Sequence, residues 1–398
     1  MARAVSGMER LWLAAGRVAP PFAVHAVVEL DAVPDERALA LAIGALHAAW
    51  PDLSPRLAGV LRGARWAPAP APPLALCPDL TWEDGDISAA IAALDAAAAL
   101  DPDGPSLRWL LVPGPPARLV LSTLHAITDG RGALTMLTAL AELLRGQAPP
   151  PLPSQRHEGD EALARGGRPV PPPRADAAAP YAPDGDPADR GRRTLRRRVA
   201  LAPRAPLARA LAAAARARPG ARLRVDVPVD LRRPALGPQT GNLSGLLRVE
   251  LPAEAGGPEG VAVVDAALRA AIDAGAHLHT TAEAQRVRAW PLWLIAGEAE
   301  RRAAAERARG AVPVSFTFSN LGRVPLPALD MGSARCTSFY PIPPAAPGLP
   351  ALCTLTGGDD GAGRVHLELL VSAPARWASA PTLAAWVEAL GAALEAPV

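Results

Sequence analysis

A histidine and an aspartate stand four residues apart in the segment 119–132, which reads LVLSTLHAITDGRG. An apolar run leads to His125, and Asp129 and Gly130 come just before an apolar pattern of helical spacing. A histidine at the end of a strand can exchange protons near neutral pH if it faces a cleft. An aspartate directly before a turn glycine can instead fix the turn or bind a cation. The segment therefore predicts a strand, a reactive turn and a helix.

The residues alone leave three roles open for Asp129. It could form a dyad with His125, ligate a metal together with His125, or pair with an arginine as a structural ion pair. A protein metal site usually has three or four ligands, and only these two candidates stand here. We therefore expect no metal at this turn.

Bulk composition limits the class of protein. A chain of 398 residues is long enough for two domains of ordinary size. The net charge of +2 gives no general reason to expect nucleic acid or a membrane surface as a partner. The three cysteines, Cys77, Cys336 and Cys353, lack the spacing of a zinc site or a disulfide framework. With no signal-like start and no long apolar run, we expect a cytoplasmic protein without a membrane span.

Apolar periodicity and turn residues divide the chain into an N-terminal lobe (1–146), a proline-rich crossover linker (147–191) and a C-terminal lobe (192–398). Strands are predicted at 23–30, 57–66, 106–112, 118–124, 194–201, 223–231, 243–251, 311–321, 333–340, 351–355 and 364–371. Helices are predicted at 34–50, 87–100, 131–145, 205–218, 259–277, 282–307 and 381–396. This order indicates two α/β sandwiches with mixed sheets.

Six arginines lie between Arg190 and Arg198, where the linker meets the C-terminal lobe. They could be a solvated end of the linker, since runs of charge usually face water. They could also bind a phosphate of coenzyme A or an acidic carrier protein.

The HAITDG sequence from His125 to Gly130 resembles the second half of the HHxxxDG signature of the chloramphenicol acetyltransferase-like superfamily. This superfamily includes condensation domains, polyketide-associated acyltransferases and wax-ester synthases. Leu124 replaces the first histidine of the signature. Three later segments resemble superfamily elements in the same order: PVDLRRP at 228–234, GNLSG at 241–245 and SNLG at 319–322.

The resemblance implies two chloramphenicol acetyltransferase-like α/β lobes arranged in a V, with a tunnel at their interface. It implies that His125 is the general base. It also implies that Asp129 turns away from the substrate and pairs with Arg232. Gly130 would allow a close approach of the backbone to the substrate, or a positive φ.

Five further residues are candidates for substrate binding: Arg131, Asn242, Ser244, Ser319 and Asn320. Arg131 could bind an anionic group or simply face solvent. Ser244 and Ser319 could donate hydrogen bonds to an oxyanion or orient the acceptor. His277 and His279 are expected at the surface, and His47 in packing or at the surface.

Acyl transfer from a thioester needs a base, a stabilised oxyanion and the exclusion of water. Because the chain resembles this superfamily, we expect a free-standing acyltransferase with no resident cofactor. Its donor would be an acyl-CoA or an acyl-carrier-protein thioester, and its acceptor a small hydroxyl or amine compound. Two alternatives stay open: a condensation-type enzyme that forms amide bonds between carrier proteins, and a catalytically silent relative that binds a partner in the same cleft.

Overall fold

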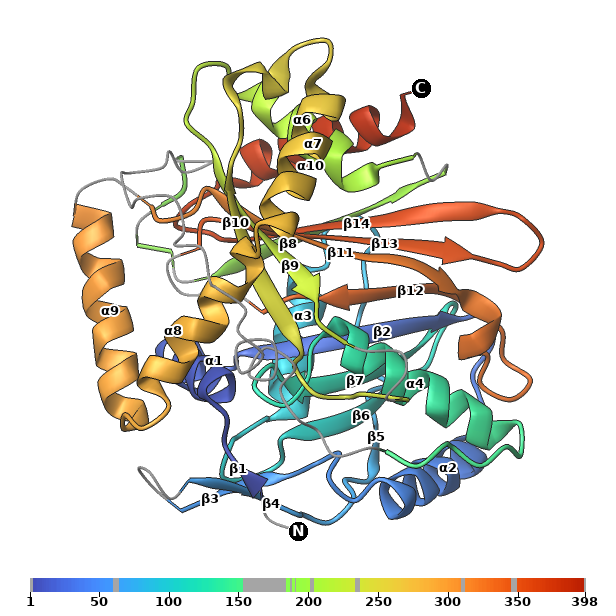
Figure 1. Cartoon of the computed structure of the whole chain (residues 1–398). Coiled ribbons are helices and arrows are strands. Elements are labelled where there is room, and N and C mark those ends of the chain that lie inside the picture. Colours follow the sequence, from blue (N-terminus) through green and yellow to red (C-terminus); the bar gives the residue numbers. More distant parts are fainter. Residues whose placement is uncertain are drawn as a thin grey trace.

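The computed structural model of the chain describes residues 3–59, 64–152, 184–186, 188–189, 191–200, 204–232, 237–308, 312–344 and 349–396. Most of the predicted linker, together with Arg190 and residues 233–236, lies outside these ranges. The described chain forms two large mixed sheets, each covered by helices (Figure 1). The predicted α/β class and its two-sheet arrangement are therefore confirmed.

The first sheet is built around two central strands in which apolar residues predominate. Its order is β12 (Cys336–Ile342), β2 (Ala23–Leu30), β7 (Ala117–Leu124), β6 (Leu107–Val112) and β5 (Leu74–Leu76). Every residue of β2 and β7 is buried, as expected for central strands covered on both faces. On one side lie α2 (Glu36–Ala49) and α4 (Gly130–Leu144), which pack against each other.

The second sheet has the order β10 (Ser244–Glu250), β9 (Arg224–Asp230), β11 (Phe316–Pro325), β13 (Leu352–Asp359), β14 (Val365–Pro374) and β8 (Arg192–Val199). Three helices cover it: α6 (Pro206–Ala217), which packs against both of the others, α7 (Gly260–Asp273) and α10 (Ala380–Glu395). Between the two sheets, α3 (Ser88–Ala98) contributes to a small shared core with Tyr340 and Leu370.

One strand crosses from the second half of the sequence into the first sheet. β12 pairs antiparallel with β2, with Tyr340 opposite Val27. The first sheet is therefore completed by residues that follow β11 in the second sheet.

Two predicted elements are each divided in two. The predicted strand 57–66 is instead β3 (Arg56–Ala58) and β4 (Arg65–Ala67), which pair antiparallel in a small sheet with β1 (Arg3–Ala4). Gly59 adopts a φ of 77° just after β3, a conformation that ends a strand. The predicted helix 282–307 is instead α8 (His279–Val287) and α9 (Leu292–Ala308), because Pro291 breaks the helical hydrogen-bond pattern.

Helix α1 (Gly7–Val18) lies beside α8 and α9 at one side of the molecule (Figure 1). It begins with a capping box, in which the side chains of Ser6 and Glu9 bind each other's backbone N–H groups. No helix in the described ranges is long and apolar enough to cross a bilayer.

For Arg196, an ion-pair network between the two sheets corrects both interpretations of the arginine run. Arg196 on β8 is buried and binds Glu29 on β2 at 2.7 Å and Glu368 on β14 at 2.8 Å. Tyr340 from β12 donates a hydrogen bond to Glu29. Arg196 is therefore neither solvated nor free to bind a phosphate, because it joins the two sheets.

Candidate active site

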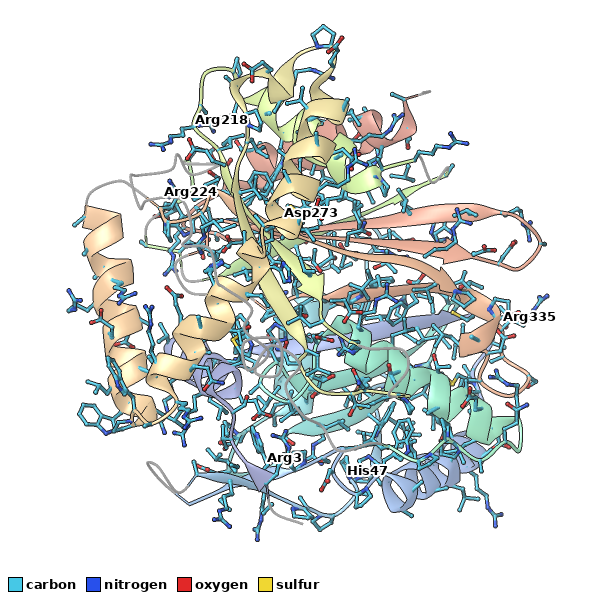
Figure 2. All side chains as sticks on the ribbon, viewed as in Figure 1. Arg3, His47, Arg218, Arg224, Asp273 and Arg335 are labelled. Atoms are coloured by element: carbon cyan, nitrogen blue, oxygen red, sulfur yellow. The ribbon has the colours of Figure 1, made fainter. Side chains whose placement is uncertain are left out.

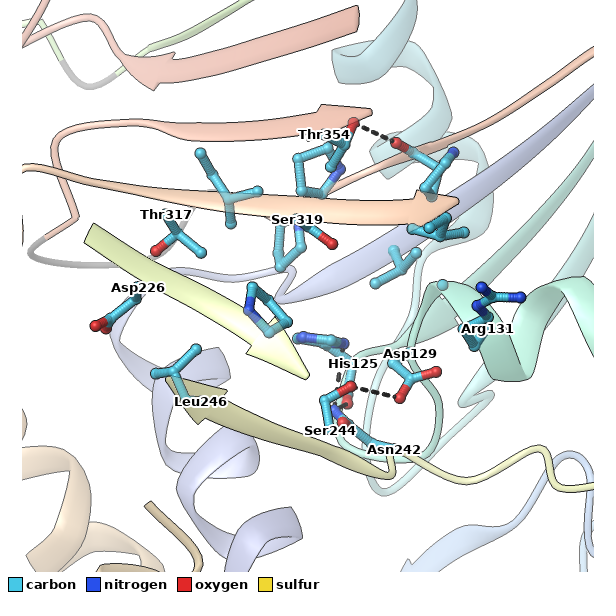
Figure 3. Close-up of a pocket in the computed structure, with 18 of the residues that line it drawn as sticks. His125, Asp129, Arg131, Asp226, Asn242, Ser244, Leu246, Thr317, Ser319 and Thr354 are labelled. Carbon is cyan, nitrogen blue, oxygen red and sulfur yellow. Dashed lines mark hydrogen bonds between the residues drawn. The ribbon is translucent and has the colours of Figure 1, made fainter. Parts of the chain in front are cut away.

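A cavity of about 190 Å³ lies where β7 and α4 meet the second sheet (Figure 3). One wall comes from α1, β2 and the β7–α4 turn, and the other from β9, β10, β11 and β13. The cavity is lined by every predicted site residue except Arg232, namely His125, Asp129, Gly130, Arg131, Asn242, Ser244, Ser319 and Asn320. Segments more than a hundred residues apart in sequence thus contribute to one site.

His125 follows β7 directly and projects into the cavity (Figure 3). Its backbone N–H donates to the carbonyl of Phe22 at 2.9 Å. Its ring Nδ1 lies 3.0 Å from the carbonyl oxygen of Thr128. A carbonyl can only accept, so Nδ1 carries the hydrogen and Nε2 has a free lone pair. The contact therefore selects the tautomer that a general base at Nε2 requires.

Two aromatic side chains hold the imidazole from its sides. The ring centroid of His125 lies 5.0 Å from that of Trp12 and 5.6 Å from that of Phe22. Burial lowers the pKa of His125 below its ordinary value of 6.5, because an enclosed site disfavours the charged ring. The hydrogen bond to Thr128 and the charge of Asp129 oppose this shift only in part. The ring is consequently neutral near pH 7.

Asp129 caps α4 and faces away from the imidazole. Its Oδ1 accepts from the backbone N–H of Gly132 at 2.9 Å and from Arg232 Nη2 at 2.6 Å. Its Oδ2 accepts from Arg232 Nη1, the Leu243 N–H and the Ser244 hydroxyl. Burial alone would raise the pKa of Asp129, but the charge of Arg232 and these hydrogen bonds hold it below its usual value. Asp129 is thus an ionised structural partner in this arrangement, as the resemblance implied.

The loop before β10 grips the histidine turn from the second sheet. The side-chain amide of Asn242 donates to the backbone carbonyl of His125 at 2.7 Å. Thr128 donates its hydroxyl proton to the carbonyl of Thr240. At Gly132, a Cβ atom would overlap both this carbonyl and the Thr128 hydroxyl. Asn242 was predicted to bind substrate, whereas its side-chain amide here binds the backbone of His125.

The remaining candidate residues differ in whether their polar side-chain atoms are available to bind a ligand. Ser244 donates to Asp129, which corrects its predicted role as an oxyanion donor. Asn320 accepts from the N–H of Gly322 and so shapes a turn. Arg131 is 41% exposed, with Nε 3.9 Å from Asp230. The hydroxyl of Ser319 lines the cavity and has no hydrogen-bond partner among the described residues.

Of the two expected uses of Gly130, the positive φ is wrong, whereas a close approach to the substrate stays a prediction because Gly130 lines the cavity. Its φ is not positive, and an added Cβ would meet the side chain of Leu321 at 3.3 Å. The glycine therefore allows close packing of the turn against β11.

Four site residues were not predicted from the sequence: Trp12, Phe22, Thr128 and Gly132. Thr128 and Gly132 lie inside the HxxxDG region, so their position next to the base was available as a signal. Trp12 and Phe22 lie more than a hundred residues earlier, and no spacing rule connects them to His125.

The other histidines of the described ranges lie outside the cavity lining. His25 contacts Ser122 at 2.8 Å and Asp95 at 2.9 Å, but His25 and Ser122 are fully buried and a substrate cannot reach them. His47 on α2 accepts the indole N–H of Trp109, and burial lowers its pKa to about 4 (Figure 2). His279 is buried, which corrects its predicted surface position.

No family model matches the sequence. Comparison with curated proteins gives no match either.

Solved structures match over nearly the whole chain. The starter condensation domain of rhizomide synthetase RzmA, a variant solved with C8-CoA, aligns with a TM-score of 0.63 and 16% identity, covering 99% of this chain and 94% of that one. The condensation domain of the monacolin K polyketide synthase MokA aligns with a TM-score of 0.66 and 14% identity, covering 99% of this chain and 97% of that one. The first condensation domain of the CDA synthetase aligns with a TM-score of 0.64 and 19% identity, covering 100% of this chain and 97% of that one. The chain therefore has the two-lobe α/β fold of condensation domains, which the HxxxDG resemblance implied.

Proposed function

We propose that the protein is an acyltransferase that moves an acyl group from a thioester to the hydroxyl or amine of a small acceptor, with His125 as general base. The observation that carries the proposal is the bond from Nδ1 to the Thr128 carbonyl. It leaves a neutral Nε2 available in a cavity between the two sheets.

In the proposed reaction, Nε2 takes the proton of the acceptor as the acceptor oxygen or nitrogen attacks the thioester carbonyl. A tetrahedral oxyanion forms. When it collapses, the carbon–sulfur bond breaks and the leaving thiolate takes the proton back from Nε2. The Thr128 carbonyl stabilises the transient imidazolium through its bond to Nδ1. No covalent acyl-enzyme is needed, because the thioester is already activated.

We infer that Ser319 donates to the oxyanion. Its hydroxyl lies in the cavity lining, on the strand that faces the base, and is not used by another described residue. Ser244 cannot take this role while its hydroxyl proton is held by Asp129.

The donor is proposed to be an acyl-CoA or an acyl-carrier-protein thioester, bound as a co-substrate. The match to a condensation domain solved with C8-CoA supports a thioester donor. Another structure of that domain contains Leu-SNAC as well as C8-CoA. This likeness favours amide-bond formation between carrier proteins as the second candidate. Leu124 speaks against it, because the first signature position is here an apolar residue of the core.

Free-thiol release from short, medium and long acyl-CoA donors, each with alcohol and amine acceptors, tests the proposal. His125→Ala should lower turnover by about 10²- to 10⁴-fold, the usual contribution of a general base, without a change in thermal midpoint. His277→Gln alters a half-buried histidine outside the cavity lining and should keep full turnover.

Turnover only when the acyl donor and the amine acceptor are both carrier-bound would favour the second candidate. Full activity in the folded His125→Ala variant would refute the base. A parent protein that transfers no acyl group from any donor, yet binds a partner in the cleft, would support the silent relative.

A further inference from the structure

The turn between α8 and α9 carries exposed tryptophans. All nine tryptophans of the chain lie in the described ranges, and only Trp290 and Trp293 are exposed, at 42% and 63%. Leu294 beside them is 40% exposed. The other large exposed apolar residues, Val33, Leu41, Leu76 and Ile272, are scattered singly, which is normal for a protein surface. Trp290, Trp293 and Leu294, in contrast, form a cluster of exposed apolar side chains.

The fold holds these side chains outward on an ordered support. α8 and α9 form a hairpin at one side of the molecule, with its turn at the lower left of Figure 1. The inner face of α9 is anchored, because Ile295 and Ala296 pack against Ala14 of α1. Arg10 of α1 binds the backbone carbonyl of Trp290 at 3.3 Å. The apolar tip is therefore a fixed protrusion.

Positive charge accompanies the apolar tip. Arg286 and Arg288 are exposed at the end of α8, and neither forms an ion pair with an acid in the described ranges. Glu283, the nearest exposed acid on α8, stands about a turn further from the tip. Tryptophan suits a bilayer interface, since its ring has an apolar body and an N–H donor, and arginine suits anionic headgroups.

The exposed area argues against a protein as the occupant. Trp290 and Trp293 together offer about the area of one whole tryptophan side chain, on the order of 250 Å². A stable protein–protein interface buries roughly 800 Å² on each partner. A small protruding apolar tip with adjacent cations fits shallow insertion into a lipid surface.

We propose that the α8–α9 tip, formed by Arg286, Arg288, Trp290, Trp293 and Leu294, binds the surface of an anionic lipid bilayer. The inference is independent of the acyl-transfer proposal, since none of these five residues lines the cavity.

Flotation of the full chain with phosphatidylcholine vesicles, with and without phosphatidylglycerol, tests this proposal. The chain should float with the anionic vesicles, and the double variant W290A/W293A should lose at least tenfold in apparent affinity. R286Q/R288Q should lose the preference for anionic lipid. The matched control L41A removes a more exposed apolar residue from α2 and should bind as the parent does.

Failure of the parent to float, or equal binding by W290A/W293A, would overturn the proposal. If size-exclusion chromatography shows the parent as a dimer and W290A/W293A as a monomer, the tip would instead bind a second copy of the chain. Turnover of W290A/W293A with a water-soluble thioester donor should equal the parent's, so loss of membrane binding stays separate from loss of catalysis.

Discussion

Asp129 and Asp230 both bind the guanidinium of Arg232, but water reaches them to different extents. The side chain of Asp129 is 7% exposed and that of Asp230 42%. Asp129→Asn should lower the free energy of unfolding by about 3–5 kcal/mol, because Arg232 would stay largely buried without its main counter-charge. Asp230→Asn removes a solvated partner and should change it by less than about 1 kcal/mol. Urea denaturation of the two variants measures the difference.

The same pair makes stability depend on pH in a defined direction. The pKa of Asp129 is held below its usual value in the folded state. Its contribution is therefore present above the unfolded-state pKa and is lost as pH falls through the folded-state pKa. Equal unfolding free energies for Asp129→Asn and Asp230→Asn would show that Asp129 is not the dominant partner.

The lowered pKa of His125 predicts the pH dependence of turnover. The base acts in its neutral form, so kcat/KM should be constant from about pH 7 upward and fall in acid. The midpoint of this fall should lie below 6.5, because burial disfavours the imidazolium. A pH–rate profile with a non-titrating acceptor alcohol measures it. A midpoint above 6.5 would mean that the ring is not enclosed as described.

At the level of elements, Gly132 fixes the distance between α4 and the loop before β10. A Cβ there would overlap the backbone carbonyl of Thr240, which cannot move like a side-chain end. Gly132→Ala should therefore lower both the thermal midpoint and turnover, although alanine favours helix by about 1 kcal/mol elsewhere. A Cβ added at Gly44 on α2 would meet no neighbouring atom within 4 Å, so Gly44→Ala should be neutral or stabilising. Differential scanning fluorimetry of both variants compares the two effects; a stabilised Gly132→Ala protein would contradict the close approach.

Most elements could be predicted from the sequence because their apolar patterns are local. β2 matches its predicted range, 23–30, and α4 and α10 begin and end within a residue or two of theirs. The failures also have local causes. Pro291 and Gly59 break elements that apolar periodicity alone would continue.

At the scale of the whole molecule, the two sheets are joined by charge. Arg196 is 6% exposed and Glu368 fully buried, so Arg196→Met would leave Glu368 and Glu29 enclosed without their main partner. We expect a loss of about 3–5 kcal/mol in the free energy of unfolding. Arg198, on the same strand and bound to the same two acids, is 46% exposed. Arg198→Met should cost less than about 1 kcal/mol, and chemical denaturation compares the two; equal losses would contradict the difference in burial.

The assembly of the site was predictable only in part. HxxxDG and its later companion segments indicated His125, Asp129 and Arg232, because each lies in a short pattern. Arg196 was misread because charge in sequence is usually solvated, and only the sheet arrangement places its guanidinium between two acids. Trp12 and Phe22 join the site through tertiary packing, which has no sequence period.

The exchange of β12 has a consequence for any attempt to dissect the protein. A fragment ending near residue 146 would lack this strand and present β2, eight residues long and mostly apolar, as an open edge. Unprotected edges of that kind recruit other chains and precipitate. Mixing separately produced halves is therefore an unpromising route to a correctly folded protein. Producing both halves together makes β12 available to pair with β2 from the start.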